Sequence, residues 1–219
     1  MPREQTESER LSGIKNPVKL IIIASEGIKA ETQYFNELER ICDQNIVRPF
    51  IIRKTPDKKG HSAPQHVLKQ MKDFKKNSSF KEGDEFWLVL DVDSWTNLEE
   101  IIATGAEDNI QMAISNPCFE LWLLLHLKKV ADLDDKERKA LLQNDKVSKQ
   151  HTYTSRFLGA AMKEVLGKNC SKTRINAPSL MPYVDDAVTR AKDMTSISGI
   201  PEGLGSNVYR IVEQIQMGD

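Results

Sequence analysis

Acidic side chains follow two of the most apolar runs in the sequence. Glu26 comes just after "VKLIIIA" (18–24), Asp91 ends "EFWLVLD" (85–91), and Asp93 follows two residues later. Active sites of open parallel sheets lie at the carboxyl ends of the strands, so neighbouring strands would bring these three carboxylates together. Carboxylates this close repel one another and raise each other's pKa unless a cation neutralises them. Such oxygen ligands suit Mg²⁺ or Mn²⁺, and the pattern predicts a divalent metal site held by Glu26, Asp91 and Asp93.

Each half of this pattern also has a plainer explanation. An Asp-x-Asp sequence is common at strand ends, where Asp91 or Asp93 could simply cap the helix that follows. The glycine after Glu26 is a weak signal alone, although Gly27 would let the chain turn sharply and a phosphate come close. The two halves together, each at the end of an apolar strand, favour the metal site.

Two further residues are candidates for catalysis. Glu120 stands in the apolar run "FELWLLLHL", where a charged side chain needs a partner or a metal. An exposed helix face is the alternative. His61, between Gly60 and Ser62 in a basic loop, could donate a proton or contact a phosphate. We interpret Asn116, at the turn before the apolar run, as a helix cap.

Basic side chains gather in two stretches, 53–61 and 146–174, although the net charge of the chain is −1. Lysine and arginine in such stretches can contact phosphates, and a solvated helix face is the plainer alternative. A net charge this small gives no overall attraction to nucleic acid. The residues that we predict to bind nucleic acid are Lys54, Lys58, Lys59, Lys149 and Arg156.

The composition is that of an ordinary globular protein. Of the 219 residues, 39% are hydrophobic and 29% charged, a balance that folds without metals or disulfides. The apolar runs are too short to span a bilayer, and the polar N-terminus lacks a signal-peptide core. Three widely spaced cysteines, none in a Cys-x-x-Cys pair, indicate reduced thiols. We therefore expect a cytoplasmic protein that does not associate with membranes.

Four apolar runs predict strands, and the segments between them have helical periodicity. We expect the strands at 18–24, 46–53, 85–91 and 109–115. This alternation predicts an α/β fold with a mostly parallel sheet of about four strands, flanked by helices.

The strand signals stop after residue 130. Helices are expected at 132–143, 155–166, 183–194 and 206–216. The sequence thus predicts a flexible arm at 1–16, a sheet domain at 17–130 and a helical extension at 131–219 that packs on or caps the sheet domain.

An apolar strand followed by Glu-Gly, and a later one followed by Asp-x-Asp, resembles the Toprim domain of topoisomerases, primases and related nucleases. Longer strings are similar to the RloB-like family of Toprim proteins. They are "ASEGIKAETQYFNEL", "GHSAPQHVLKQM", "FWLVLDVDSW", "AISNPCFELWLLLHL" and "GSNVYRIVEQI". Glu26 matches the Toprim glutamate, and Asp91 and Asp93 match its aspartate pair. Where the family tends to have "EGxxTE", this chain has "EGIKAET", and Glu31 could instead serve the helix dipole.

The resemblance implies metal-dependent cleavage of a phosphodiester, in phage-defence loci and beside an ATPase partner. It favours a Mg²⁺- or Mn²⁺-dependent nuclease with Glu26, Asp91, Asp93, Glu120 and His61 as its catalytic residues. RNA, tRNA included, and DNA are both open as substrates, and a homo-oligomer is open as well. The alternative is a non-catalytic module that binds nucleic acid, a nucleotide or the ATPase partner and regulates it.

Overall fold

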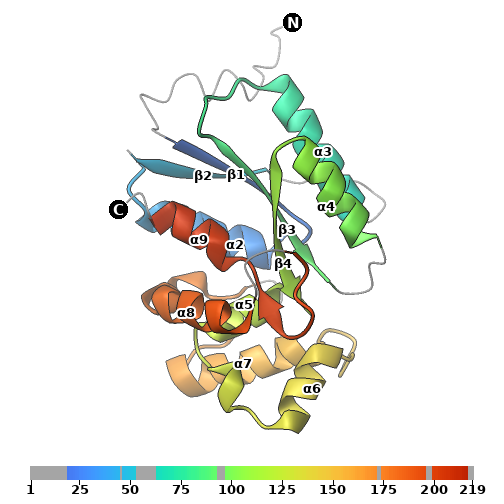
Figure 1. Cartoon of the computed structure of the whole chain (residues 1–219). Helices are drawn as coiled ribbons and strands as arrows, with labels where there is room; N and C mark the ends of the chain where they lie inside the picture. The colour runs from blue at the N-terminus through green and yellow to red at the C-terminus, as the bar shows by residue number, and fades with distance from the viewer. Residues whose placement is uncertain are drawn as a thin grey trace, which may run out of the picture.

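The strands of the computed structural model form one sheet in the order β2-β1-β3-β4-β5 (Figure 1). The structure describes residues 19–44, 46–52, 63–92, 97–171, 174–195 and 199–216. The strands are β1 (Lys19–Ser25), β2 (Val47–Ile51), β3 (Glu85–Asp91), β4 (Ile110–Asn116) and β5 (Gly205–Ser206). The first four pair in parallel, and β5 pairs antiparallel with the end of β4.

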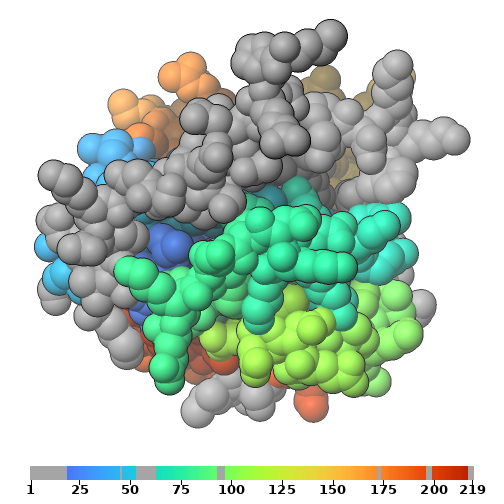
Figure 2. Space-filling view, turned by 90° about the horizontal axis from the view of Figure 1, so that it is seen from above, coloured from blue at the N-terminus to red at the C-terminus, as the bar shows by residue number. Residues whose placement is uncertain are grey.

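The helices cover both faces of this sheet. They are α2 (Ala30–Ile41), α3 (Pro64–Asn77), α4 (Leu98–Glu107), α5 (Phe119–Leu125), α6 (Asp135–Gln143), α7 (Tyr153–Leu166), α8 (Val184–Met194) and α9 (Tyr209–Gln216). Short 3₁₀ turns are η1 (Val130–Asp132), η2 (Ala177–Ser179) and η3 (Met181–Tyr183). Helices α3 and α4 adjoin on one surface (Figure 2), whereas α2 and α9 lie on the opposite face of the sheet (Figure 1).

The middle residues of the central strands β1 and β3 are all apolar because both faces of these strands are covered. In β1, Ile22 packs with the side chains of α3 and α4, and its neighbours Ile21 and Ile23 pack with those of α2, α5 and α9. All three are fully buried. Alternate residues of a strand point to opposite faces, so a strand between two helical layers needs apolar side chains at every position.

The α/β fold with a mostly parallel sheet is confirmed, and four strands occur where the sequence predicts them. The prediction that strand signals stop after residue 130 is wrong, because β5 adds a short fifth strand. An added Cβ on Gly205 would lie 2.8 Å from Thr195 Oγ1 and 3.2 Å from the Cβ of Pro201. Only glycine fits this close approach. Because β5 occupies Gly205 and Ser206, the last helix begins at Tyr209 instead of at the predicted residue 206.

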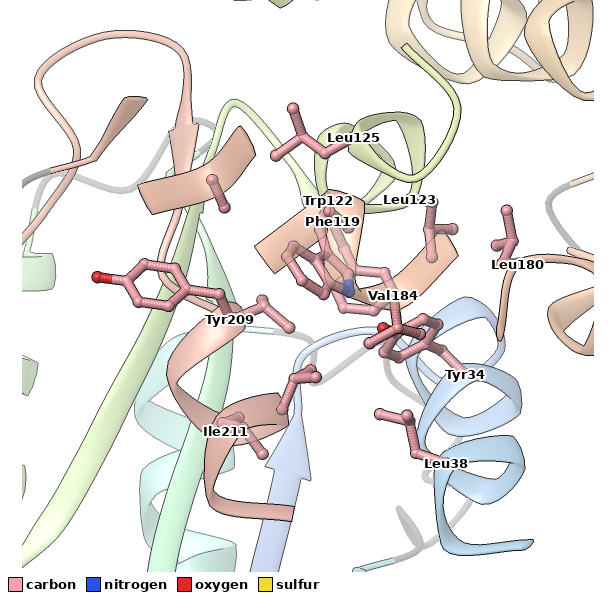
Figure 3. Packing of buried hydrophobic residues seen from close by; sticks show 14 of the residues in the cluster. Tyr34, Leu38, Phe119, Trp122, Leu123, Leu125, Leu180, Val184, Tyr209 and Ile211 are labelled. Carbon is pink, nitrogen blue, oxygen red and sulfur yellow. The ribbon is translucent and has the colours of Figure 1, made fainter. Parts of the chain in front are cut away.

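The helices after residue 130 share their apolar core with the sheet. Helices α6 and α7 lie beyond the edge at which β4 ends (Figure 1). Figure 3 shows α5 at the centre of the shared cluster, with Trp122 and Leu123 near Tyr34 of α2 and Val184 of α8. The domain boundary at 130 stays a prediction, and the predicted arm at 1–16 lies outside the described residues. Across the described residues, the helices are all too short or too polar to cross a bilayer.

Candidate functional site

Two of the predicted acids meet at the carboxyl edge of the sheet. Strands β1 and β3 are neighbours, and the N–H of Glu26 continues their ladder by donating to Val89 O at 3.0 Å. This bond holds Glu26 beside the end of β3. The backbone N–H of Asp91 lies 3.5 Å from Glu26 Oε2. The sequence therefore predicted correctly that these two residues converge.

Asp91 lies in a strongly unfavourable electrostatic environment for a carboxylate. Burial raises its pKa well above the ordinary value, and the negative charges of Glu31, Glu120 and Glu26 raise it further. A hydrogen bond from the backbone N–H of Phe119, at the start of α5, acts in the opposite direction. Four carboxylates are thus near enough to couple electrostatically.

Glu31 belongs to this cluster, although it was not among the predicted site residues and a helix-dipole role was open for it. Its side chain is buried, and its charge affects Asp91 more than that of any other acid. An added Cβ on Gly27 would meet the Glu31 carboxylate at about 2.0 Å. Gly27 therefore makes room for Glu31, a role different from the predicted approach of a phosphate. The signal in the sequence is the spacing of Glu31 from Glu-Gly, in the first turn of α2.

Glu120 reaches the cluster from a different element. It lies in the first turn of α5, which follows directly from the end of β4. Its charge raises the pKa of Asp91. Burial is the main cause of the raised pKa of the Cys118 and Cys170 thiols, and the charge of Glu120 is the next largest cause. Glu120 was predicted either to join the site or to lie on an exposed helix face. The structure supports the first alternative, because Glu120 lies near enough to Asp91 to raise its pKa. Cys118 is a neighbour that the sequence analysis missed, and its only signal is its position between β4 and Glu120.

A narrow hollow adjoins Glu120 on the side of α7. Glu120, Ala30, Ser155 and Cys170 line it, together with His151. The Oγ of Ser155 lies 3.5 Å from Nδ1 of His151. The hollow brings polar side chains from residues 151–171 next to the acids of the sheet edge.

The remaining predicted residues are exposed, have a different role or lie outside the described residues. Lys149, which precedes α7, and Arg156, which lies in α7, are both exposed. The predicted cap role of Asn116 is wrong, because its Nδ2 donates to Pro201 O at 2.8 Å and the residue at the cap position of α5 is Cys118. The predicted site residues that lie outside the described residues are Asp93, His61, Lys54, Lys58 and Lys59.

A divalent metal fits the donors at this edge in chemical kind. In the described segments, no three His, Cys, Asp or Glu side chains are arranged as a coordination shell. Mg²⁺, however, commonly binds proteins through one or two carboxylates, with water and substrate phosphate as its other ligands. Glu26 and Asp91 can supply those two, and a cation there would relieve the repulsion that raises the pKa of Asp91.

Comparison with known proteins gives one match. A family model described as RloB-like protein matches residues 21–215, a range that contains Glu26, Glu31, Asp91 and Glu120. No curated protein and no solved structure matches the chain.

Proposed function

The chain belongs to the RloB-like family, and we propose that it is a divalent-metal-dependent nuclease that hydrolyses phosphodiesters in RNA or DNA. The observation that carries the proposal is that Glu26 and Asp91 meet at the ends of neighbouring strands. Burial there raises the pKa of Asp91, and the charges of the nearby glutamates raise it further. Repulsion of this kind costs stability in a folded protein, so its presence at a strand end is better explained by a cation-dependent task.

In this proposal Glu26 and Asp91 hold Mg²⁺ or Mn²⁺. When bound, the metal supplies charge neutralisation at the phosphoryl oxygens and a lowered pKa for an attacking water. Glu31 and Glu120 contribute negative charge next to Asp91, which strengthens the attraction for the cation. Asp93 would add a third carboxylate, as the resemblance to Toprim proteins implies.

The biological setting of the proposal comes from the family resemblance. RloB-like proteins are associated with phage-defence loci, so we propose a role in antiphage defence by abortive infection, under the control of an ATPase partner. Lys149 and Arg156, both exposed, are proposed to contact the phosphates of the substrate.

The test is cleavage of pooled tRNA, total RNA and plasmid DNA with Mg²⁺ or Mn²⁺. We expect Glu26→Gln and Asp91→Asn each to lower the cleavage rate by roughly 100-fold or more. Asp193→Asn is the matched control, because Asp193 is exposed on α8 and its variant should cleave like the wild type. The absence of cleavage by the wild type, both alone and with the ATPase, would contradict the proposal and favour the binding-module alternative.

A further inference from the structure

Strand β4 has an edge that β5 covers only at one end. Strand β5 pairs with Ser115 and Asn116, and the N–H of Asn207 donates to Ile114 O at 2.9 Å. The chain then turns into α9 at Tyr209. On the side away from β3, no strand of the described segments pairs with residues 110–113.

The direction of the backbone groups along this edge follows from the printed bonds. Ser115 O accepts from Val92 N on the β3 side, whereas Ile114 O accepts from Asn207 on the β5 side. Backbone groups alternate in direction along a strand, so those of Ile110 and Met112 point to the same side as those of Ile114. Met112 O has a side-chain donor there, Arg210 Nη1, at 3.4 Å. An incoming strand would therefore meet backbone groups in the correct alternation.

A hollow lies on each face of the sheet beside this edge. The first has a volume of about 530 Å³ and is lined by Ile102 of α4 and Met112. The second has a volume of about 560 Å³ and is lined by Trp87 and Tyr209. Both hollows share Arg210. Successive side chains of an added strand point to opposite faces, so they would enter the two hollows in turn.

Arg210 is the charge that faces such a strand. Its guanidinium lies 5.0 Å from the ring centroid of Trp87 and donates to Gln111 Oε1 at 3.3 Å. Among the described residues no carboxylate pairs with it. The acids nearby already have partners, since Glu85 binds Lys19 and Glu213 binds Lys192. Arg210 therefore selects for a negative side chain.

We propose that the free edge of β4 binds an extended segment of a partner protein, in which apolar and acidic residues alternate. Its backbone pairs with Ile110 and Met112, its apolar side chains enter the hollow beside Ile102, and an acidic side chain binds Arg210. The guanidinium then exchanges its long bond to Met112 O for a charge-assisted one. Strand addition of this kind takes affinity from the backbone and specificity from pockets for alternate side chains.

A second copy of this chain fits the edge less well. Two β4 strands pairing about a twofold axis would bring both Arg210 side chains to one junction, and like charges there oppose association. The edge also lies toward the amino end of the sheet, where Asp84 and Glu85 line the first hollow. Binding there does not depend on the proposed chemistry at the carboxyl end.

The first experiment uses a short fluorescein-labelled peptide in which Val and Glu alternate, and measures its binding to the full chain by fluorescence anisotropy. The matched probe is the same peptide N-methylated at the amides that would face β4. We expect N-methylation to weaken binding by roughly tenfold or more, because it removes backbone hydrogen bonds. No binding of the Val/Glu peptide, or equal binding of both peptides, would overturn the proposal.

The second experiment reverses the charge. Arg210→Glu should weaken binding of the Val/Glu peptide by roughly tenfold or more and favour a peptide in which Val and Lys alternate. Arg40→Glu, at an exposed position on α2, should change neither, and circular dichroism verifies that both variants are folded. Unchanged peptide preference in Arg210→Glu would contradict the proposal. A wild-type dimer in analytical ultracentrifugation that Arg210→Glu dissociates would also contradict the proposal, because the occupant of the edge would then be a second copy of the chain.

Discussion

At the scale of single residues, burial and the charges of three glutamates oppose the ionisation of Asp91 at the end of β3. Because its pKa is raised in the folded protein, the ionised carboxylate lowers the free energy of unfolding at neutral pH. This cost disappears as the pH falls through the folded pKa to the ordinary value. We expect Asp91→Asn to raise the free energy of unfolding at pH 7, without metal, by about 1 kcal/mol. Thermal melts should show a gain of about 2–4 °C.

The same melts separate this effect from metal binding. Added Mg²⁺ should stabilise the wild type and leave Asp91→Asn unchanged, since the variant lacks a ligand. The control Asp193→Asn should respond to Mg²⁺ like the wild type. If Asp91→Asn were no more stable than the wild type at pH 7 without metal, the charge cluster would not act as described.

His126 titrates in the opposite sense. Burial lowers its pKa to about 4 from 6.5. Its Nδ1 lies 3.0 Å from Trp122 O and must donate to that carbonyl, so Nε2 accepts from the Tyr34 hydroxyl. As the pH falls, the imidazole of the unfolded chain is protonated before that of the folded chain, which favours the unfolded state. Lowering the pH from 6.5 to 4 should therefore lower the free energy of unfolding by about 3 kcal/mol through this residue.

The titration of His126 can be measured directly by NMR. Its ring signals, assigned by their loss in His126→Gln, should not move between pH 7.5 and pH 5.5 because the ring stays neutral in the folded protein. A midpoint near the ordinary histidine value would refute this prediction.

The sequence predicted the convergence of Glu26 and Asp91 because both end strands of one parallel sheet. It could not place Glu31, since the approach of a helix to the sheet depends on packing. The same holds for Glu120, whose face on α5 was open from the sequence. Residues at strand ends are therefore predictable from pattern, whereas residues on helices that pack against them are not.

At the scale of elements, β5 is held by buried side chains more than by its length. Ser206 N donates to Thr195 Oγ1 at 3.1 Å, and Ser206 Oγ lies 2.9 Å from Ser115 Oγ. Thr195→Val keeps the shape and removes the acceptor, so we expect a loss of about 1–3 kcal/mol in the free energy of unfolding. Urea unfolding measures it. Thr189→Val, at an exposed position on α8, should change stability by less than about 0.5 kcal/mol, and an equal loss in both variants would exclude the anchoring role.

The elements that the sequence predicted correctly are the long ones. Strand β3 was predicted with its observed limits because Phe86 to Leu90 are apolar at every position, between an acidic residue at each end. Strand β5 has two residues, Gly205 and Ser206, too few to show a periodicity and neither a strong strand former. Its position depends on contacts with Thr195 and Ser115, which are distant in the sequence.

At the scale of the whole molecule, one apolar cluster joins the sheet to the helices that follow residue 130. It contains Ile21 and Trp87 from the sheet. It also contains Leu123 from α5, Val184 from α8 and Ile211 from α9 (Figure 3). Helices that share a core with a sheet cannot unfold without exposing apolar surface on it. The molecule should therefore unfold as a single unit, as expected of the predicted helical extension that packs on or caps the sheet domain.

Leu123→Ala tests this expectation, because Leu123 is fully buried in the shared cluster. Its truncation should cost about 2–5 kcal/mol and should weaken the sheet and the C-terminal helices equally. Hydrogen exchange followed by mass spectrometry should show the same loss of protection in β1 and β3 as in α8 and α9. Leu142→Ala is the control, since Leu142 is 40% exposed on α6. If the helices lost protection in the Leu123 variant while the sheet kept it, the part after residue 130 would be a separate folding unit.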